Sequence, residues 1–363
     1  RVRFVPRAGR AAGGSTGTAT GAASGRTVSQ ETSYGSPGNT GAVVLASTSF
    51  PEKRFAAPEA PAATAPASAP ATVQVLDPGA LTLVHDLGRP GLSRLGVGTS
   101  GAFDRAAHRL ANRLVGNDEG AAGFELLLGG ARFALPEGAW VAITGAEGPV
   151  TLDGRPVLRA HAVRADRAGA ALHLGPARLG LRYSVAVRGG LETPVELGSR
   201  SRDTLAALGP VPLAAGDAVA LGDAIAGPVP AIDLAAVDAL PASPTELPLR
   251  PGPRHDWFTD AAWERMLLTE WTVSSRADRT GVRLEGATLE RRATTLGLEL
   301  PSEGMLPGAL QVSPDGVPTI LGPDHPVTGG YPVIAVVTDD ARDRLAQLRP
   351  GDPVRLRLAT GRP

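Results

Sequence analysis

The fold is decided by residues 140–158, which read WVAITGAEGPVTLDGRPVL. Trp140–Thr144, Val150–Leu152 and Val157–Leu158 are short apolar runs typical of strands, and Asp153-Gly154 between the last two predicts a type I′ hairpin. Similar runs recur along the chain, at Val73–Val75, Leu81–Val84, Tyr183–Val187, Val219–Leu221, Trp271–Val273, Val282–Glu285, Val333–Val337 and Val354–Leu358. Many short strands at close spacing predict a mainly β, barrel-like chain rather than a doubly wound α/β sheet.

Few segments have the period of a helix. Asp104–Val115 has an apolar face and is followed by Gly116-Asn117, which predicts a helix with a glycine stop. A short amphipathic helix is expected near Asp260–Leu268. A last helix is expected to be capped by Thr338, with two aspartates in its first turn that suit the helix dipole, and to end at Pro350-Gly351.

The chain has 363 residues, which is enough for about two domains of the usual size. Residues 1–71 are mostly Ala, Gly, Ser, Thr and Pro, and such a segment cannot bury enough apolar surface to offset its ordering entropy. We therefore predict a disordered, flexible linker there. A first β domain is expected over 72–240 and a second over 248–359. The stretch Ala231–Pro251 is rich in Pro and Ala without a persistent strand pattern, and is the predicted boundary.

Bulk composition excludes several classes of protein. The 36 basic and 36 acidic side chains give a net charge of zero, which argues against a nucleic-acid or membrane-surface binder. The chain has no cysteine, so disulfides, thiolate metal sites and cysteine nucleophiles are excluded. No apolar run is long enough to predict a membrane span and no charged-then-apolar leader is seen, so we expect a cytoplasmic protein.

Lysine usage narrows the chemistry further. Lys53 is the only lysine, and it lies in the low-complexity segment. A Walker P-loop, Schiff-base chemistry and covalent biotin attachment all need a lysine, so the folded part is expected to do none of these alone. Any nucleotide must be held by arginine side chains and backbone, or by a partner.

Two blocks interleave glycines with charged and hydroxyl side chains. The first runs over His85–Gly91 and on to Ser100–Asp104, and the second runs over Pro301–Gly308 and ends at Thr328–Pro332. Glycine lets the backbone approach a ligand closely, while arginine and aspartate hold anionic or hydrogen-bonding groups. We expect the chemistry of the protein at these two blocks.

Other motifs give weaker indications of function. Gly96–Gly101 matches the dinucleotide fingerprint, but Leu92–Leu95 before it is a poor strand, so a turn-rich loop is expected. The side chains of His85 and Asp86 are expected to point to opposite faces of a strand end, so they form no dyad. The six histidines lack metal-ligand spacing, and we predict no metal site on them.

Polar residues gather at two further places. Arg188-Gly189-Gly190 and Gly198–Asp203 combine backbone amides, hydroxyls and guanidinium groups, which indicates a carboxylate or phosphate site. The alternative is that Arg200 and Asp203 form a surface ion pair of little effect. Near the last glycine-rich loops, the candidates for acid/base or orienting work are Glu303, Gln311 and Asp324.

Taken together, these segments resemble the carboxyltransferase-like family that comprises the C subunit of the bacterial ATP-dependent 5-oxoprolinase, the second subunit of so-called allophanate hydrolases and the matching part of urea amidolyase. The resemblance covers about Thr72 to Leu358 in order, with a departure at His85, where glutamine is expected. It is carried by Val84–Gly91, Ser100–Asp104, Ala111–Asn117, Ala186–Gly190, Leu197–Ser201, Gly252–Arg254, Asp256–Phe258, Ser302–Gly304, Pro307–Val312 and Thr328–Pro332.

The resemblance implies a fold and an activity. The fold would be two cyclophilin-like β-barrel subdomains. The activity would be the opening of 5-oxoproline to glutamate by the A, B and C subunits together, driven by ATP. Phosphorylation of the amide oxygen would supply the leaving group that an unstrained amide lacks. ATP, with Mg²⁺, would be bound by this chain or by one of its partners, and no biotin would be attached to this chain.

The site residues expected from the resemblance fall into three groups. The anion holders are Arg89, Arg188, Arg200 and Arg254. The carboxylates that would handle protons or a magnesium ion are Asp104, Glu303 and Asp324. Further substrate-binding residues are Ser100, Ser199, Gln311, Thr328, Gly329, Gly330 and Tyr331. Asp104 has a simpler alternative role, as a first-turn residue that stabilises the N-terminus of its helix.

Three further expectations concern context. Arg1–Pro6 resembles the last strand of the family's B subunit, so the chain is expected to derive from a B–C fusion, or to resemble one, with residues 7–71 as the tether. The first alternative function is transfer of a carboxyl group from carboxybiotin, which another chain would carry, to a urea-like or amide substrate. The second is a non-catalytic role as the regulatory partner of a kinase-inhibitor protein.

Overall fold

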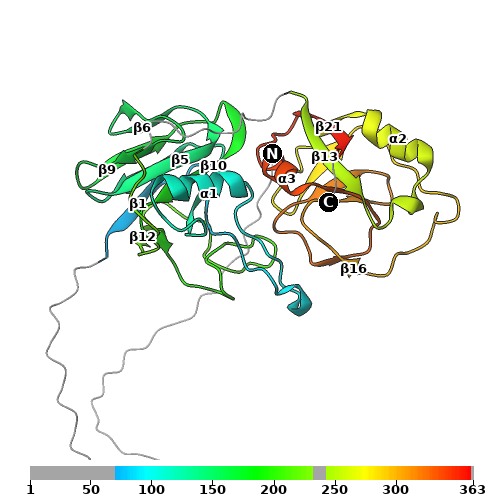
Figure 1. Cartoon of the computed structure of the whole chain (residues 1–363), viewed down its shortest axis with the longest axis horizontal. Helices are drawn as coiled ribbons and strands as arrows, with labels where there is room; N and C mark the ends of the chain where they lie inside the picture. Colours follow the sequence, from blue (N-terminus) through cyan, green and yellow to red (C-terminus); the bar gives the residue numbers. More distant parts are fainter. Residues whose placement is uncertain (1–69, 232–242, 361–363) are drawn as a thin grey trace, which may run out of the picture. The chain divides into compact units, whose positions relative to one another are not determined.

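The computed structural model describes residues 70–231 and 243–360 (Figure 1). The predicted linker over 1–71, Arg1–Pro6 included, lies outside these residues except for its last two. No helix within the described ranges is long and apolar enough to cross a membrane. The strands up to residue 231 are β1 Thr72–Asp77, β2 Leu81–His85, β3 Gly123–Leu127, β4 Ala131–Leu135, β5 Trp140–Glu147, β6 Val150–Leu152, β7 Arg155–Pro156, β8 Ala162–Arg164, β9 Ala170–Leu174, β10 Leu179–Val187, β11 Leu191–Glu192 and β12 Ala218–Leu221.

The first twelve strands form two sheets. One has the order β11-β12-β1-β4-β9-β6-β7 and the other β2-β3-β10-β5-β8. The closed barrel expected here is therefore replaced by two separate sheets. Short alternating strands are common to sandwiches and barrels, so the sequence pattern does not decide closure. The hairpin at Asp153-Gly154 is confirmed: both residues have positive φ (49° and 78°), and β6 pairs with β7.

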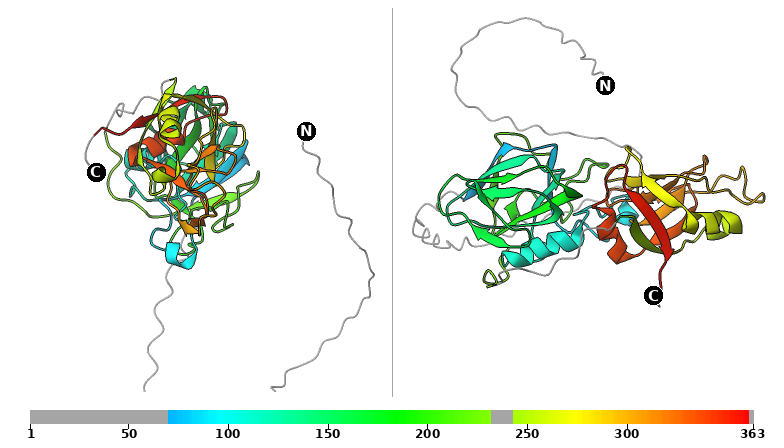
Figure 2. Two further views of the ribbon diagram at one scale, coloured as in Figure 1. Left: turned by 90° about the vertical axis from the view of Figure 1, so that its right-hand side faces the viewer. Right: turned by 90° about the horizontal axis from the view of Figure 1, so that it is seen from above.

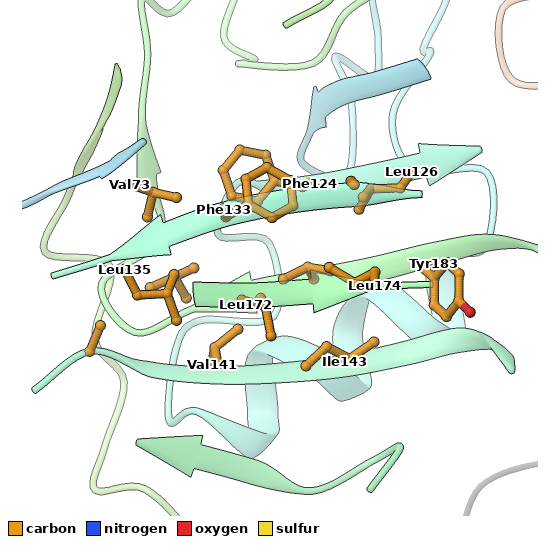
Figure 3. Close-up of a cluster of buried hydrophobic side chains, with 14 of the residues drawn as sticks. Val73, Phe124, Leu126, Phe133, Leu135, Val141, Ile143, Leu172, Leu174 and Tyr183 are labelled. Carbon is orange, nitrogen blue, oxygen red and sulfur yellow. The ribbon is translucent and has the colours of Figure 1, made fainter. Parts of the chain in front are cut away.

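The core of this half lies between the two sheets, to which both contribute apolar side chains (Figure 3). Phe124 of β3 and Phe133 of β4 stack with ring centroids 4.9 Å apart, one from each sheet. Leu172 from β9 and Ile143 from β5 are likewise buried in this cluster. The central strands thus bury apolar side chains against the opposite sheet.

Helix α1, Arg105–Leu114, covers the outer face of the smaller sheet (Figure 1). Its apolar residues Ala111 and Leu114 pack against Ala142 of β5 and Ala186 of β10, whose small side chains let the helix approach closely. The predicted helix is confirmed, and the residue before it, Asp104, is its N-cap. The 3-10 helix η1, Ser93–Leu95, occupies the poor strand before the fingerprint-like glycines.

The remaining elements are β13 Thr245–Pro251, η2 His255–Trp257, α2 Asp260–Leu268, β14 Glu270–Val273, β15 Gly281–Glu285, β16 Glu303–Gly304, β17 Ala309–Val312, β18 Pro318–Leu321, β19 Thr328–Gly329, β20 Val333–Val337, α3 Asp339–Leu345 and β21 Pro353–Leu358. Seven of the strands close into a barrel with the order β13-β20-β17-β18-β15-β14-β21. The predicted barrel is therefore confirmed for this half.

Alternating side chains fill the core of the barrel. In β21, Val354 and Leu356 are buried in the barrel core, while Arg355 and Arg357 face outward. Trp271 of β14 is fully buried and donates its indole N–H to the carbonyl oxygen of Met266 at 3.0 Å. Helix α2, which ends two residues before β14, lies on the outside of the barrel (Figure 2).

Strand β13 corrects the expectation that the stretch before Pro251 has no strand. We expected no persistent strand over Ala231–Pro251, but Thr245–Pro251 pairs with both β20 and β21. Leu247 and Leu249 are buried in alternation, and the interspersed prolines hide this pattern. Proline lacks an N–H, yet its carbonyl still accepts: Pro248 O receives the N–H of Thr338 at 2.9 Å. The domain bounds 72–240 and 248–359 stay a prediction.

Candidate functional site

The glycine-rich segment after β2 folds back on itself. Arg89 N–H donates to Thr99 O at 2.8 Å, and Ala102 N–H donates to Asp86 O at 2.9 Å. Gly88 and Gly101 have φ of 87° and 93°, and a Cβ at either position would collide with the backbone of the opposite arm. Only glycine fits at these two crossings, so the sequence folds locally into two closely apposed arms.

Asp86 organises the next loop along the chain. Its carboxylate accepts hydrogen bonds from the hydroxyls of Ser199 and Ser201, each at 2.6 Å, and from the N–H groups of Arg200 at 2.6 Å and Gly88 at 2.7 Å. Burial alone would raise the pKa of Asp86, but these hydrogen bonds outweigh it and hold the pKa below its usual value. The predicted residue Ser199 is thus tied to the first glycine-rich block through an ionised carboxylate.

A buried ion cluster joins this region to the barrel. Arg279 donates to Asp324 through Nε (2.8 Å) and Nη2 (3.0 Å), and to Glu125 of β3 through Nη1 (2.6 Å). Its Nη2 also donates to Gly101 O at 2.6 Å. Arg182 lies 3.5 Å from the same Glu125 oxygen. We call Glu125, Arg182, Arg279 and Asp324 the buried ion cluster; its members are at most 6% exposed.

The cluster fixes the charge of its acids. Burial would raise the pKa of Glu125, but Arg279 overcomes this and lowers it to about 2. The pKa of Asp324 is lowered too, because the charge and hydrogen bonds of Arg279 outweigh burial. Ser100, held at φ 52°, donates its hydroxyl to Asp324 at 2.7 Å, so two predicted residues meet here. An Asp324 carboxylate that stays ionised suits orientation and charge stabilisation better than proton uptake.

The four predicted anion holders already have partners within the chain. Arg89, which is 2% exposed, donates to the carbonyl oxygen of Ser201 at 2.5 Å. Arg188 donates to the carbonyl oxygens of Val115 at 2.7 Å and Gly227 at 2.8 Å. Arg200 donates to Thr193 O and pairs with Glu192, each at 2.5 Å, and Arg254 pairs with Glu303. Their role in binding an anion stays a prediction.

The second glycine-rich block forms a small ribbon of its own. Strands β16 and β19 pair Glu303 with Gly329 and Gly304 with Thr328. Glu303 forms an ion pair with Arg254, and this hydrogen-bonded contact holds its pKa below the usual value. Of the neighbouring predicted residues, Tyr331 is 44% exposed, Gly330 follows the ribbon directly, and Gln311 lies on β17 opposite Thr319.

Asp104 has the pKa best matched to proton transfer near neutrality. Its carboxylate accepts the N–H of Ala107 at 2.8 Å, which caps α1, and the side-chain amide of Gln347 at 2.6 Å. Burial raises the pKa to about 6, more than these hydrogen bonds lower it. The structure therefore bears out its helix-capping alternative and gives it an unusual pKa at the same time.

Asp104→Asn is expected to remove a pH-dependent loss of stability. Because the folded-state pKa is raised, the folded protein binds the extra proton between about pH 4 and 6, and its stability falls as the pH rises through this window. Asparagine caps helices as well as aspartate and stays neutral. The stability of the variant relative to the wild type should rise by about 2–3 kcal/mol from pH 4 to pH 7.5 in urea unfolding. A difference that is flat with pH would contradict the assignment.

Two cavities flank the first glycine-rich block. One, of about 220 Å³, is lined by Thr99, Ser100, Phe103, Arg105, Arg109 and Arg342 among others, and we call it the arginine cavity. The other, of about 230 Å³, is lined by Asp86, Asp118, Glu192, Arg200 and Asp223 together with the Gly189-Gly190 turn. Of the predicted residues, Ser100 thus lies at the first cavity and Arg200 at the second. Within residues 70–231 and 243–360, no group of three or more His, Asp or Glu side chains is placed to hold a metal ion.

The family of the chain follows from a comparison with known domains. A family model described as the carboxyltransferase domain, subdomains A and B, matches residues 95–358. The chain belongs to this carboxyltransferase-domain family. It is 33% identical to the C subunit of 5-oxoprolinase from Escherichia coli (strain K12) over 285 residues, which cover 78% of this chain and 89% of that protein. It is 31% identical to the urea amidolyase of Lachancea kluyveri, with 78% of this chain and 17% of that protein covered.

Solved structures of this carboxyltransferase-domain fold agree with the sequence comparison. The crystal structure of TTHA0988 superposes with a TM-score of 0.71 at 34% identity, covering 79% of this chain and 56% of that one. The urea amidolyase of K. lactis gives a TM-score of 0.69 at 28% identity, with 80% of this chain and 19% of that one covered. The chain therefore spans just over half of the first solved chain and about a fifth of the second.

Several residues of this carboxyltransferase-domain site were missed from the sequence. Arg279 gives no local signal in the sequence, because nothing near it indicates its distant partners. Glu125 gives a detectable signal, since it is a lone charge inside the buried strand GFELL. Asp86 was noted beside His85 but given no role. Arg109 lies on a helix face, where an arginine is ordinarily only solvated.

Proposed function

We propose that the chain is the C subunit of an ATP-dependent 5-oxoprolinase, which opens 5-oxo-L-proline to L-glutamate together with its A and B subunits. The extent of the likeness carries the proposal. It covers 89% of the C subunit from Escherichia coli, whereas it covers 17% of the Lachancea kluyveri urea amidolyase. The chain thus matches nearly the whole of the one protein and a small part of the other. We also propose, from the same resemblance, that the β domains of the chain are similar in fold to cyclophilin.

The kinds of group that this chemistry needs are present beside the glycine-rich loops, which supports the proposal. Opening a lactam needs stabilisation of charge on the carbonyl oxygen and a proton for the departing nitrogen. Arginine side chains and the buried, ionised acids provide fixed charge beside the glycine-rich loops. Among the proposed acid/base residues, Asp104 has a pKa of about 6 and is the one able to exchange a proton near neutral pH. Asp324 and Glu303 would act as ionised orienting groups.

The nucleotide is better placed on a partner. Drug-sized ligands occupy pockets of roughly 300–1,000 Å³, and the two cavities described above hold about 220 and 230 Å³. These cavities therefore do not fit a whole ATP molecule. We propose that one of the two partner proteins contributes most of the ATP site, and that this chain contributes to binding the small acid.

The test is a substrate comparison in the assembled complex. This chain is purified with the A and B subunits, and ADP release is measured with 5-oxo-L-proline, with urea plus a biotinylated carrier, and with no substrate. The proposal predicts that 5-oxoproline stimulates ADP release and that urea with the carrier does not. Stimulation by urea with the carrier alone would overturn it.

The second candidate is carboxyl transfer from carboxybiotin. One observation favours it: the K. lactis urea carboxylase superposes on this chain with a TM-score of 0.71 at 27% identity, and the superposition covers 80% of this chain. The chain covers 28% of that larger enzyme. In this case biotin would arrive on another chain, because Lys53 is the only lysine present.

A further inference from the structure

The lining of the arginine cavity contains three arginines and no acidic residue. Arg105 and Arg109 reach it from α1 and Arg342 reaches it from α3, and no Asp or Glu is among its lining residues. Burial and then the neighbouring Arg105 guanidinium lower the pKa of Arg342. Like charges this close repel one another, and a bound anion would relieve the repulsion.

The three arginines differ in how far they are already engaged. Arg105 donates to Asp343 Oδ1 at 3.3 Å and to Asp339 O at 2.7 Å, and Arg342 donates to Asp339 Oδ1 at 2.7 Å. Arg109 has a single ion pair among the described residues, with Glu119 at 3.7 Å, which is too long for a hydrogen bond. No hydrogen bond from the Arg109 guanidinium to another described residue is seen, and its side chain is 39% exposed, so its donors are available to a ligand.

The other lining residues limit the size and polarity of a ligand that the cavity could hold. Leu87, Phe103, Pro307, Leu321 and Leu345 supply apolar surface, and Thr99 supplies a hydroxyl group. The hydroxyl of Ser100, which also lines the cavity, is already donated to Asp324. Ser100 sits in the wall at a φ of 52°, a conformation that non-glycine residues adopt mainly where the surroundings enforce it. A cavity of about 220 Å³ admits a compact molecule only. A small ring or short chain with one acidic group matches this lining.

We propose that the arginine cavity binds a small carboxylic acid with a compact apolar body, and that Arg109 is the residue that holds its carboxylate. Arginine matches a carboxylate with two parallel donors, and Arg105 and Arg342 add a favourable field. The class of ligand follows from the cavity itself. That the acid is 5-oxoproline rests on the proposed function.

The test compares Arg109→Gln with a matched control on the same helix. Arg113 is also on α1 and bonds to the same Glu119, at 2.7 Å, but does not line the cavity. Calorimetric titration is carried out on the full chain and on its complex with the A and B subunits. The probes are 5-oxo-L-proline, its neutral analogue 2-pyrrolidinone, and inorganic phosphate.

The proposal predicts that 5-oxoproline binds and that 2-pyrrolidinone and phosphate bind at least about tenfold more weakly. Arg109→Gln should weaken 5-oxoproline binding at least about tenfold, and Arg113→Gln should bind as the wild type does. Equal binding by both variants, in the chain and in the complex, would overturn the proposal. So would phosphate binding tighter than the acid.

Failure of this inference can be told apart from failure of the proposed function. If the complex turns over 5-oxoproline and Arg109→Gln leaves its KM unchanged, the proposed function is supported and the proposed role of Arg109 is wrong. If the complex does not turn over 5-oxoproline, but the acid binds and Arg109→Gln weakens its binding, the proposed binding site is supported and the proposed function is wrong.

Discussion

Arg279→Met is expected to lower the free energy of unfolding by about 3–5 kcal/mol. The substitution leaves Glu125 and Asp324 buried without the guanidinium that bonds to both. It also removes the donor to Gly101 O, which holds one arm of the first glycine-rich block. Methionine keeps an unbranched apolar stem but lacks the guanidinium, so the largest part of the loss comes from the two buried carboxylates that are left unpaired.

Equilibrium unfolding in urea at pH 7 measures this loss. Arg276→Met is the control, because Arg276 is exposed in the same turn; its effect should stay within about 0.5 kcal/mol. Adding Glu125→Gln and Asp324→Asn to Arg279→Met should recover part of the stability, since neutral amides cost less to bury than unpaired carboxylates. A loss below about 1 kcal/mol for Arg279→Met would show that the buried ion cluster does not hold this region together.

His85→Gln is expected to protect the protein against acid. His85 is fully buried, and neither ring nitrogen has a hydrogen-bond partner within the described part of the chain. Burial, followed by the charge of Arg279, lowers its pKa to about 3. Below about pH 6.5 His85 takes up a proton in the unfolded protein but not in the folded one. The free energy of unfolding therefore decreases as the pH falls.

Between pH 7 and pH 4.5 this single group should cost the wild type about 2–3 kcal/mol, which His85→Gln would retain. His108, whose pKa burial lowers to about 4, acts in the same sense in both proteins and cancels in the comparison. His173→Gln is the control, because His173 is exposed on β9. Parallel acid unfolding curves for wild type and His85→Gln would contradict the assignment.

The fold could be predicted where signals are local. The helix after Asp104, the hairpin at Asp153-Gly154 and the alternation in β21 each rest on a few adjacent residues, and each is present in the structure. Closure is a non-local property, so the separation of the first half into two sheets could not be seen. Strand β13 was missed because its prolines obscure an alternation that the barrel enforces.

The site could be predicted only in part for the same reason. Glycines and hydroxyl residues drew attention to loops that contact one another, since Ser100 and Asp324 do meet, 224 positions apart in the chain. Arginines beside glycines suggested anion sites. In the structure, Arg188 and Arg200 donate to carbonyl oxygens and to a carboxylate of their own chain. Which arginine is left free depends on distant partners, and Arg109 is recognisable only once the cavity is formed.

The central claim is tested most directly by measuring L-glutamate formed from 5-oxo-L-proline and ATP by the A and B subunits, with and without this chain. We predict glutamate and ADP in equal amounts when the chain is present, and no glutamate when it is left out. An assembled complex that contains the chain and forms no glutamate would contradict the claim.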